Sequence, residues 1–149
     1  MDARNSPDDW KQEAIKHFLQ VCQRTFQFLV DEYNFQTTPI PEGEFVNKFQ
    51  YHFSNNSLTI IIVGEGYGTI ASVSINDNHG HRIGVNNLIP GLNPFAKQKR
   101  SKKRIPQDEQ IEEAAKKLKL YGQDILSGDL TRFEQIRKDI DEMWVKKNK

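Results

Sequence analysis

The sequence predicts an α+β fold, in which an antiparallel sheet of about four strands is covered on one face by an N-terminal helix and two C-terminal helices. Three observations lead to this prediction. Apolar residues recur with helical spacing at both ends of the chain, whereas residues 44–85 alternate in polarity or are apolar over short runs, as strands do. The connections between these strand-like runs are short, which favours an antiparallel meander.

The first helix is expected over residues 7–34. Residues 6–9 (Ser-Pro-Asp-Asp) suit a helix start, because serine can cap, proline fits the first turn, and acidic side chains favour the positive end of the helix dipole. Apolar side chains between residues 10 and 33 then form a broad stripe, which is typical of a helix packed under a sheet. Cys22, the single cysteine, lies in this stripe, so we interpret it as a small core residue rather than a reactive thiol.

Four strands are expected, at residues 44–53, 58–63, 69–75 and 81–85. Aromatic and polar residues alternate in the first, as in a half-buried strand, and the second is apolar on both faces, as in a central strand. Residues 64–68 (Gly-Glu-Gly-Tyr-Gly) are interpreted as a hairpin connection rather than a phosphate-binding loop. They lead into a β-branched strand instead of a helix, and their glutamate would repel phosphate.

Two helices are expected after the strands. The first begins near Gln107 and ends at Gly122, and Asp129 caps the second, whose apolar stripe extends to Trp144. We expect this last stripe to close the core against the sheet. The alternative is that part of the stripe is exposed and binds a partner.

The sharpest chemical feature is a basic loop at about residues 90–106, an exposed connection without periodicity. Residues 97–104 (KQKRSKKR) hold six basic side chains; without them the chain has 15 basic and 20 acidic residues, a net charge of −5 instead of +1. Such a cluster can neutralise phosphates and release counterions, so nucleic acid or anionic lipid is a candidate partner. No aromatic residue is interleaved for base stacking, and a solvated loop is the alternative interpretation. The candidate nucleic-acid-binding residues are Lys97, Lys99, Arg100, Lys102, Lys103 and Arg104.

Asp77, His79 and His81 are residue types that bind metals, and on a strand the two histidines would point to the same side. Gly80 and the neighbouring asparagines indicate a turn instead, so we interpret both histidines as exposed turn residues and predict no metal site and no cofactor. No nucleophile elbow or other catalytic constellation is visible, so we do not expect an enzyme. An enzyme whose catalytic groups converge from distant positions is left open.

Length and composition set further limits. The 149 residues correspond to about one domain, residues 1–149. The longest apolar run, residues 60–63, is far shorter than the ~20 residues that a membrane span needs, and the N-terminal residues lack the apolar core of a secretion signal. A single cysteine cannot form an internal disulfide. We therefore expect a cytoplasmic protein with no membrane partner.

Residues 118–133 contain the pattern Tyr-(Gly/Ala)-x-Asp-(Ile/Val)-Leu-x-Gly-Asp-(Phe/Leu)-x-x-Phe, and residues 28–35 contain Phe-Leu-x-x-Glu-Tyr-x-Phe at the end of the first helix. The chain thereby resembles a group of small, largely uncharacterised bacterial proteins. The resemblance implies a small α+β fold and carries no catalytic residue. Some similar small bacterial proteins are immunity proteins that bind a toxin, which implies by analogy a protein-binding function. The basic segment at residues 97–104 is not part of the group's pattern.

We therefore expect a non-enzymatic, cytoplasmic protein-binding module with a protein partner, and the analogy points to an immunity-like inhibitor of a toxin. The alternative is a nucleic-acid-binding accessory protein that acts through the basic loop. The sequence does not determine the oligomeric state.

Overall fold

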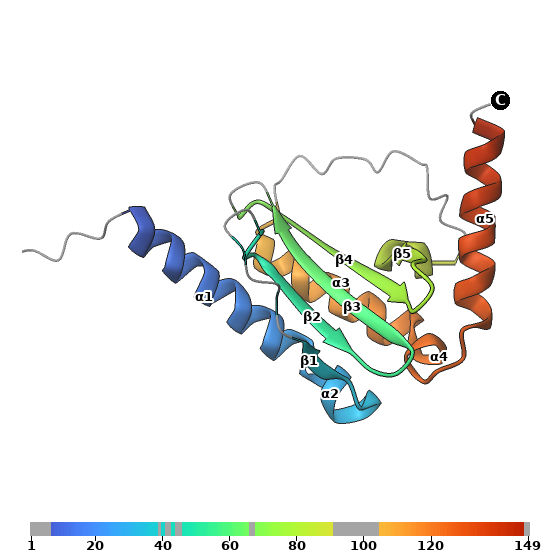
Figure 1. Cartoon of the computed structure of the whole chain (residues 1–149), viewed down its shortest axis with the longest axis horizontal. Coiled ribbons are helices and arrows are strands. Elements are labelled where there is room, and N and C mark those ends of the chain that lie inside the picture. The colour runs from blue at the N-terminus through green and yellow to red at the C-terminus, as the bar shows by residue number, and fades with distance from the viewer. Residues whose placement is uncertain are drawn as a thin grey trace, which may run out of the picture.

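The computed structural model describes residues 7–38, 40, 43, 46–65, 68–90 and 105–147 (Figure 1). Five strands lie in the middle of the chain and helices lie on either side of them in sequence. The elements in chain order are α1 (Pro7–Thr25), α2 (Gln27–Tyr33), β1 (Gln36–Thr38), β2 (Gln50–Ser54), β3 (Leu58–Glu65), β4 (Ile70–Asp77), β5 (Arg82–Gly84), the 3-10 helix η1 (Val85–Leu88), α3 (Gln107–Tyr121), α4 (Gln123–Leu126) and α5 (Thr131–Lys147).

The strands form one antiparallel meander in the order β1-β2-β3-β4-β5. This confirms the predicted α+β fold, with five strands in place of about four. The additional strand is β1, Gln36–Thr38, whose three residues are polar and exposed. It has no apolar alternation, and therefore no signal that a hydrophobic pattern could detect.

One face of the sheet forms the core. Phe53, Ile60, Ile75 and Ile83 are successive register partners across β2, β3, β4 and β5, and none is more than 2% exposed. Every second residue of β3 is buried in the same way, because successive side chains of a strand point to opposite faces. The result is a dry row of side chains that crosses four strands.

Helices α1 and α3 cover this face. Phe18 of α1 packs edge-on against Phe49, with 5.8 Å between ring centroids, and Phe26 lies 6.2 Å from Phe53. Figure 1 shows α3 behind the strands, so the face turned toward the viewer is the opposite face of the sheet. Glycine is required at Gly64, because a Cβ there would lie 2.9 Å from the Phe18 ring.

The first half of β4 is protected at its edge by α3. β5 pairs only with residues 74–76 of β4, which leaves the earlier backbone groups without a strand neighbour. The Gln110 carboxamide takes the place of that neighbour, since its oxygen accepts the Ala71 N–H at 2.9 Å and its nitrogen donates to the Thr69 carbonyl at 2.7 Å. These two hydrogen bonds attach α3 to the sheet and provide partners for backbone groups at the exposed edge of β4.

Two predicted elements have different boundaries. The helix expected over residues 7–34 is interrupted at Phe26, whose backbone is not helical, and both Phe26 at the break and Phe28 of α2 are buried. The strand expected at residues 44–53 begins only at Gln50. Just before it, the Asn47 side chain accepts the Phe49 N–H at 2.9 Å and donates to the Gly64 carbonyl at 3.2 Å, while the Phe49 carbonyl still accepts the Gly64 N–H at 2.8 Å.

The last helix departs from the expected burial. Phe133 is fully buried, and Ile136 and Ile140 pack partly against the core, but Trp144 and Val145 are 57% and 55% exposed. α5 extends past the short strand β5, so its C-terminal turns have no sheet beneath them (Figure 1). The expectation that this stripe closes the core up to Trp144 is therefore wrong.

Candidate functional site

The hairpin between β4 and β5 builds a buried carboxylate with an attached imidazole. The backbone of Asp77 donates to the His81 carbonyl, and Gly80 has φ = +83°, which completes a tight turn. Asp77 Oδ1 accepts the N–H groups of His79 and His81 at 2.9 and 2.8 Å, and Oδ2 accepts a hydrogen bond from His81 Nδ1 at 2.9 Å. The Asp77 side chain is 1% exposed, whereas that of His81 is 37% exposed.

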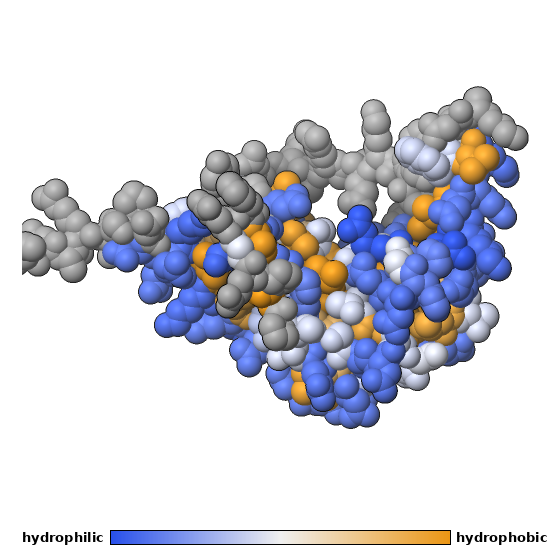
Figure 2. Space-filling view, viewed as in Figure 1, coloured by the Kyte–Doolittle hydropathy of each residue, from blue (hydrophilic) through white to orange (hydrophobic). Residues whose placement is uncertain are grey.

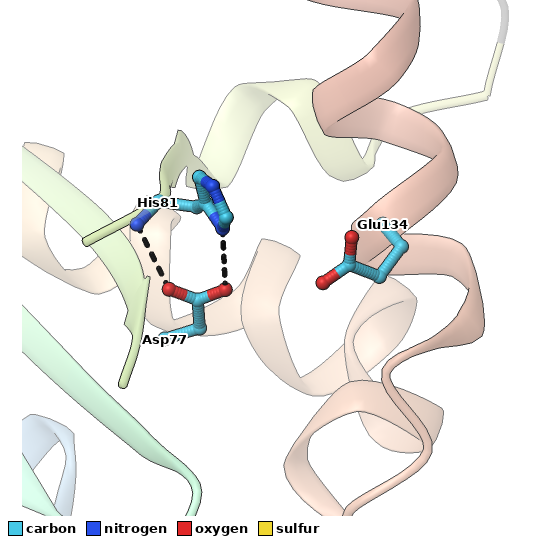
Figure 3. Close-up of side chains that lie close together, drawn as sticks. All are labelled: Asp77, His81 and Glu134. Carbon is cyan, nitrogen blue, oxygen red and sulfur yellow. Dashed lines mark hydrogen bonds and ion pairs between the residues drawn. The ribbon is translucent and has the colours of Figure 1, made fainter. Parts of the chain in front are cut away.

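Helix α5 brings a second carboxylate to this pair. Figure 3 shows the Glu134 carboxylate pointing from α5 toward Asp77 and His81. One potential ligand atom from each of the three residues lies within 4.8 Å of the other two. Glu134 is also bonded to Arg137 of its own helix, with 3.2 Å between Oε2 and Nη2.

Hydrogen bonding decides the charge of Asp77. Burial alone would disfavour its ionised form, but the hydrogen bonds from the backbone and side chain of His81 and from the backbone of His79 outweigh burial and hold the pKa of Asp77 below its ordinary value. Because an ionised carboxylate can only accept, His81 Nδ1 is the donor in this hydrogen bond. A buried carboxylate that orients an imidazole can support proton transfer or metal binding.

The structure brings together only part of the set that the sequence suggested. Asp77 and His81 are in contact, but His79 is exposed and does not belong to the group of mutually close ligand atoms. The third member, Glu134, was missed. It lies 53 residues beyond His81 in sequence on a separate helix, and no local pattern links the two.

The face of the sheet that none of the described helices covers is a second candidate site, which we call the open face. It consists of the side chains that alternate with the core row, and all of them are at least partly exposed. Short hydroxyl and amide side chains dominate, with Ile61 and Val63 in the centre. The open face comprises Gln36, Thr38, Gln50, His52, Ser54, Thr59, Ile61, Val63, Glu65, Ile70, Ser72, Ser74, Asn76, Arg82 and Gly84.

The open face is poor in charge. At the chain's overall charged fraction of 28%, about four of its 15 residues would be charged, yet only Glu65 and Arg82 are, and they lie at opposite ends of the sheet. Burial lowers the pKa of His52, which favours its neutral form. Figure 2, seen from the same side as Figure 1, shows hydrophobic, weakly polar and hydrophilic side chains interspersed in the coloured part of this face.

A cleft of about 810 Å³ lies beside α1, at the other end of the sheet from the Asp77 hairpin. Trp10, Phe49 and Lys48 contribute to its lining, and His17 Nε2 lies 2.8 Å from Asp108 Oδ2 at its wall. This ion pair joins α1 to α3, but both side chains are largely exposed, so it adds little stability.

Of the other residues singled out from the sequence, the structure describes Cys22 and most of residues 64–68 but not the basic segment. Cys22 is fully buried, and burial followed by the negative charge of Asp108 raises the pKa of its thiol to about 12, which confirms it as a core residue. Residues 64–68 connect two paired strands, so the hairpin interpretation is confirmed as well. The six basic residues Lys97, Lys99, Arg100, Lys102, Lys103 and Arg104 lie outside the described residues, and their proposed role stays a prediction.

Among the helices that the structure describes, none combines the length and the apolar character that a bilayer span requires. No protein-family model, no curated protein and no solved structure matches the chain. Functional inference therefore depends on the geometry of the described residues.

Proposed function

We propose that this chain is a non-enzymatic, cytoplasmic protein-binding module that contacts its partner through the open face. The observation that carries the proposal is the low charge of that face in an otherwise highly charged chain, with 28% charged residues overall. Charged residues are costly to desolvate and are depleted in the cores of protein interfaces. A rigid five-stranded sheet also binds with little loss of conformational entropy.

The size of the open face suits a small or standard interface. The 27 strand residues, spaced about 4.8 Å between strands and about 3.4 Å along each strand, cover roughly 440 Å² in projection. The side chains add relief to this projected area, so the accessible surface is larger. A typical protein interface buries about 800 Å² on each partner.

The chemistry of the open face favours a protein over a nucleic acid. Sheets that bind single-stranded nucleic acid present aromatic rings for base stacking together with basic side chains. The described open face has no phenylalanine, tyrosine or tryptophan and one basic residue, Arg82, at its edge. The aromatic residues Tyr51 and Phe53 of β2 alternate with it and belong to the opposite face.

The resemblance to small bacterial proteins supports an immunity-like role within this class. The two segments that carry the resemblance are adjacent in space: Lys119 Nζ lies 4.6 Å from the centre of the Phe28 ring, and a hollow of about 770 Å³ is lined by Tyr33 and Asn34 of one segment and by Ser127 and Gly128 of the other. A small protein that binds tightly through one flat face is suited to block the active site of a toxin. We propose a toxin as the partner.

Ile61→Arg, with Leu120→Arg as the matched control, tests the proposal. Ile61 is central in the open face and half-buried, whereas Leu120 is 67% exposed on the outer side of α3, so both changes place the same charge on an aliphatic position that solvent reaches. Thermal unfolding of both variants establishes that they are folded. Tagged wild-type and variant chains are then used for affinity capture from the native cells and for binding to the product of an adjacent toxin-like gene.

The proposal predicts that one protein is recovered in stoichiometric amount by the wild type and by Leu120→Arg, and at least tenfold less by Ile61→Arg, because a buried unpaired charge costs several kcal/mol in an interface. Equal recovery by all three chains would place the interface elsewhere. Recovery of nucleic acid alone, removed by nuclease, would favour the basic loop instead.

A further inference from the structure

The Asp77–His81–Glu134 cluster has the chemical composition of a metal site. An imidazole combined with two carboxylates is a mixed nitrogen and oxygen ligand set, which suits zinc and similar divalent transition ions better than magnesium or calcium. The two carboxylates come from elements far apart in sequence, the β4–β5 hairpin and α5 (Figure 3). Their negative charges are brought within 4.8 Å of one another, an arrangement that a cation stabilises.

The local geometry is close to that of a coordination sphere. Zinc bonds of about 2.0–2.2 Å place tetrahedral ligand atoms about 3.3–3.6 Å apart. Asp77 Oδ2 and His81 Nδ1 are 2.9 Å apart, and one carboxylate oxygen of Glu134 lies within 4.8 Å of one potential ligand atom of each of these residues. Metal binding requires a rotamer change of Glu134, and its side chain, which is 40% exposed, has room for one.

The remaining contacts of Asp77 hold it in place for this role. Its Oδ1 accepts the backbone N–H groups of His79 and His81, at 2.9 and 2.8 Å. The orientation of the carboxylate therefore does not depend on the bond between Oδ2 and the His81 imidazole. Oδ2 is therefore available when the proton between it and His81 Nδ1 is replaced by a metal ion. Neutral His81 then carries its proton on Nε2, and no net proton is released.

We propose that Asp77, His81 and Glu134 bind one divalent transition-metal ion, with zinc as the probe, and that the ion fastens α5 to the β4–β5 hairpin. Three protein ligands leave one tetrahedral position for water. Since β5 pairs with β4 over only three residues, a metal link between this hairpin and α5 would strengthen a short edge of the sheet. This inference is independent of the partner proposed above.

The test uses the full chain without an affinity tag that contains histidine, stripped of metal with a chelator. Calorimetric titration with Zn²⁺ should give one binding site, and Zn²⁺ but not Mg²⁺ should raise the midpoint of thermal unfolding. His81→Ala and Glu134→Gln should each weaken Zn²⁺ binding about tenfold or more, as loss of a well-placed metal contact does. His79→Ala is the matched control, because His79 lies in the same turn but outside the cluster, and it should change the affinity less than twofold.

Weaker Zn²⁺ binding by Glu134→Gln could not be attributed to misfolding, since this substitution changes a part-exposed side chain without changing its size. Absence of Zn²⁺ binding by the wild type would overturn the proposal. The same holds if His79→Ala weakens binding as much as His81→Ala, or if Glu134→Gln leaves the affinity unchanged, because zinc would then bind at surface histidines.

Discussion

Replacing Arg132 by alanine should destabilise the protein, because this side chain joins four elements. Its guanidinium contacts Asp124 of α4 through two bonds, Nε to Oδ2 at 3.1 Å and Nη2 to Oδ1 at 2.8 Å. Nη1 donates to the Leu88 carbonyl of η1 at 3.3 Å, and Nη2 also donates to the Tyr121 carbonyl at the end of α3. Arg132 itself lies in the first turn of α5.

The size of the effect follows from these contacts. Each hydrogen bond to a backbone carbonyl contributes about 1 kcal/mol net, so the two together contribute about 2 kcal/mol. The Asp124 and Arg132 side chains are 38% and 34% exposed, so solvent screens their ion pair and limits it to about 1 kcal/mol or less. Arg132→Ala should therefore lower the free energy of unfolding by about 2–3 kcal/mol.

Urea unfolding followed by circular dichroism measures this change. At an m-value of about 1.5 kcal/mol/M, a loss of 2 kcal/mol lowers the midpoint by roughly 1.3 M. Arg132→Lys should recover less than half of the loss, because one ammonium group cannot make the forked contact and reach both carbonyls. Arg24→Ala is the matched control, since Arg24 is 71% exposed with a 4.0 Å contact to Glu112. A midpoint for Arg132→Ala within 0.3 M of the control, as an order-of-magnitude limit, or full stability of Arg132→Lys, would refute the reasoning.

Three further predictions concern the core, the thiol and the basic segment. Gly64→Ala should cost about 1–3 kcal/mol in urea unfolding, because the new Cβ would lie 2.9 Å from the Phe18 ring; wild-type stability would show that α1 can shift freely. Cys22, whose pKa is raised to about 12, should react with thiol reagents only as fast as the protein unfolds, and rapid labelling at pH 8 would contradict its burial. Because the raised pKa belongs to the folded state, the free energy of unfolding should fall above the ordinary pKa of 9.0, as pH titration of stability can detect. If residues 97–104 bind DNA, the logarithm of affinity should fall with the logarithm of salt concentration with a slope of up to about −5, and neutralising all six basic side chains should abolish the binding; unchanged retention would dismiss the role.

Local patterns in the sequence were sufficient for most of the fold. The apolar run that became β3 was recognisable as a central strand, although only one of its faces is buried, and the short connections left an antiparallel meander as the simplest topology. Gly122 ends α3 as expected, and Asp129 accepts the Thr131 N–H in the first turn of α5. These features depend on residues within a few positions of one another, so they can be predicted from local sequence patterns.

Contacts over long sequence distances required the tertiary structure. Whether the stripe of α5 is buried up to Trp144 depends on how far the sheet extends beneath it, and β5 is only three residues long. The strand boundary at Gln50 depends on a bond between Asn47 and the distant Gly64 carbonyl. In both cases an ordinary local pattern was overridden by the position of another element.

For the candidate sites too, some features follow from local sequence and others from contacts between distant elements. The sequence by itself determined the α+β composition, the buried Cys22, the Asp-His turn and the concentration of positive charge at residues 97–104. Only the tertiary structure brought Glu134 to that turn and left one face of the sheet with almost no charge. The physical reason is that periodicity specifies which side of its own element a residue occupies, whereas the packing of elements decides what lies opposite.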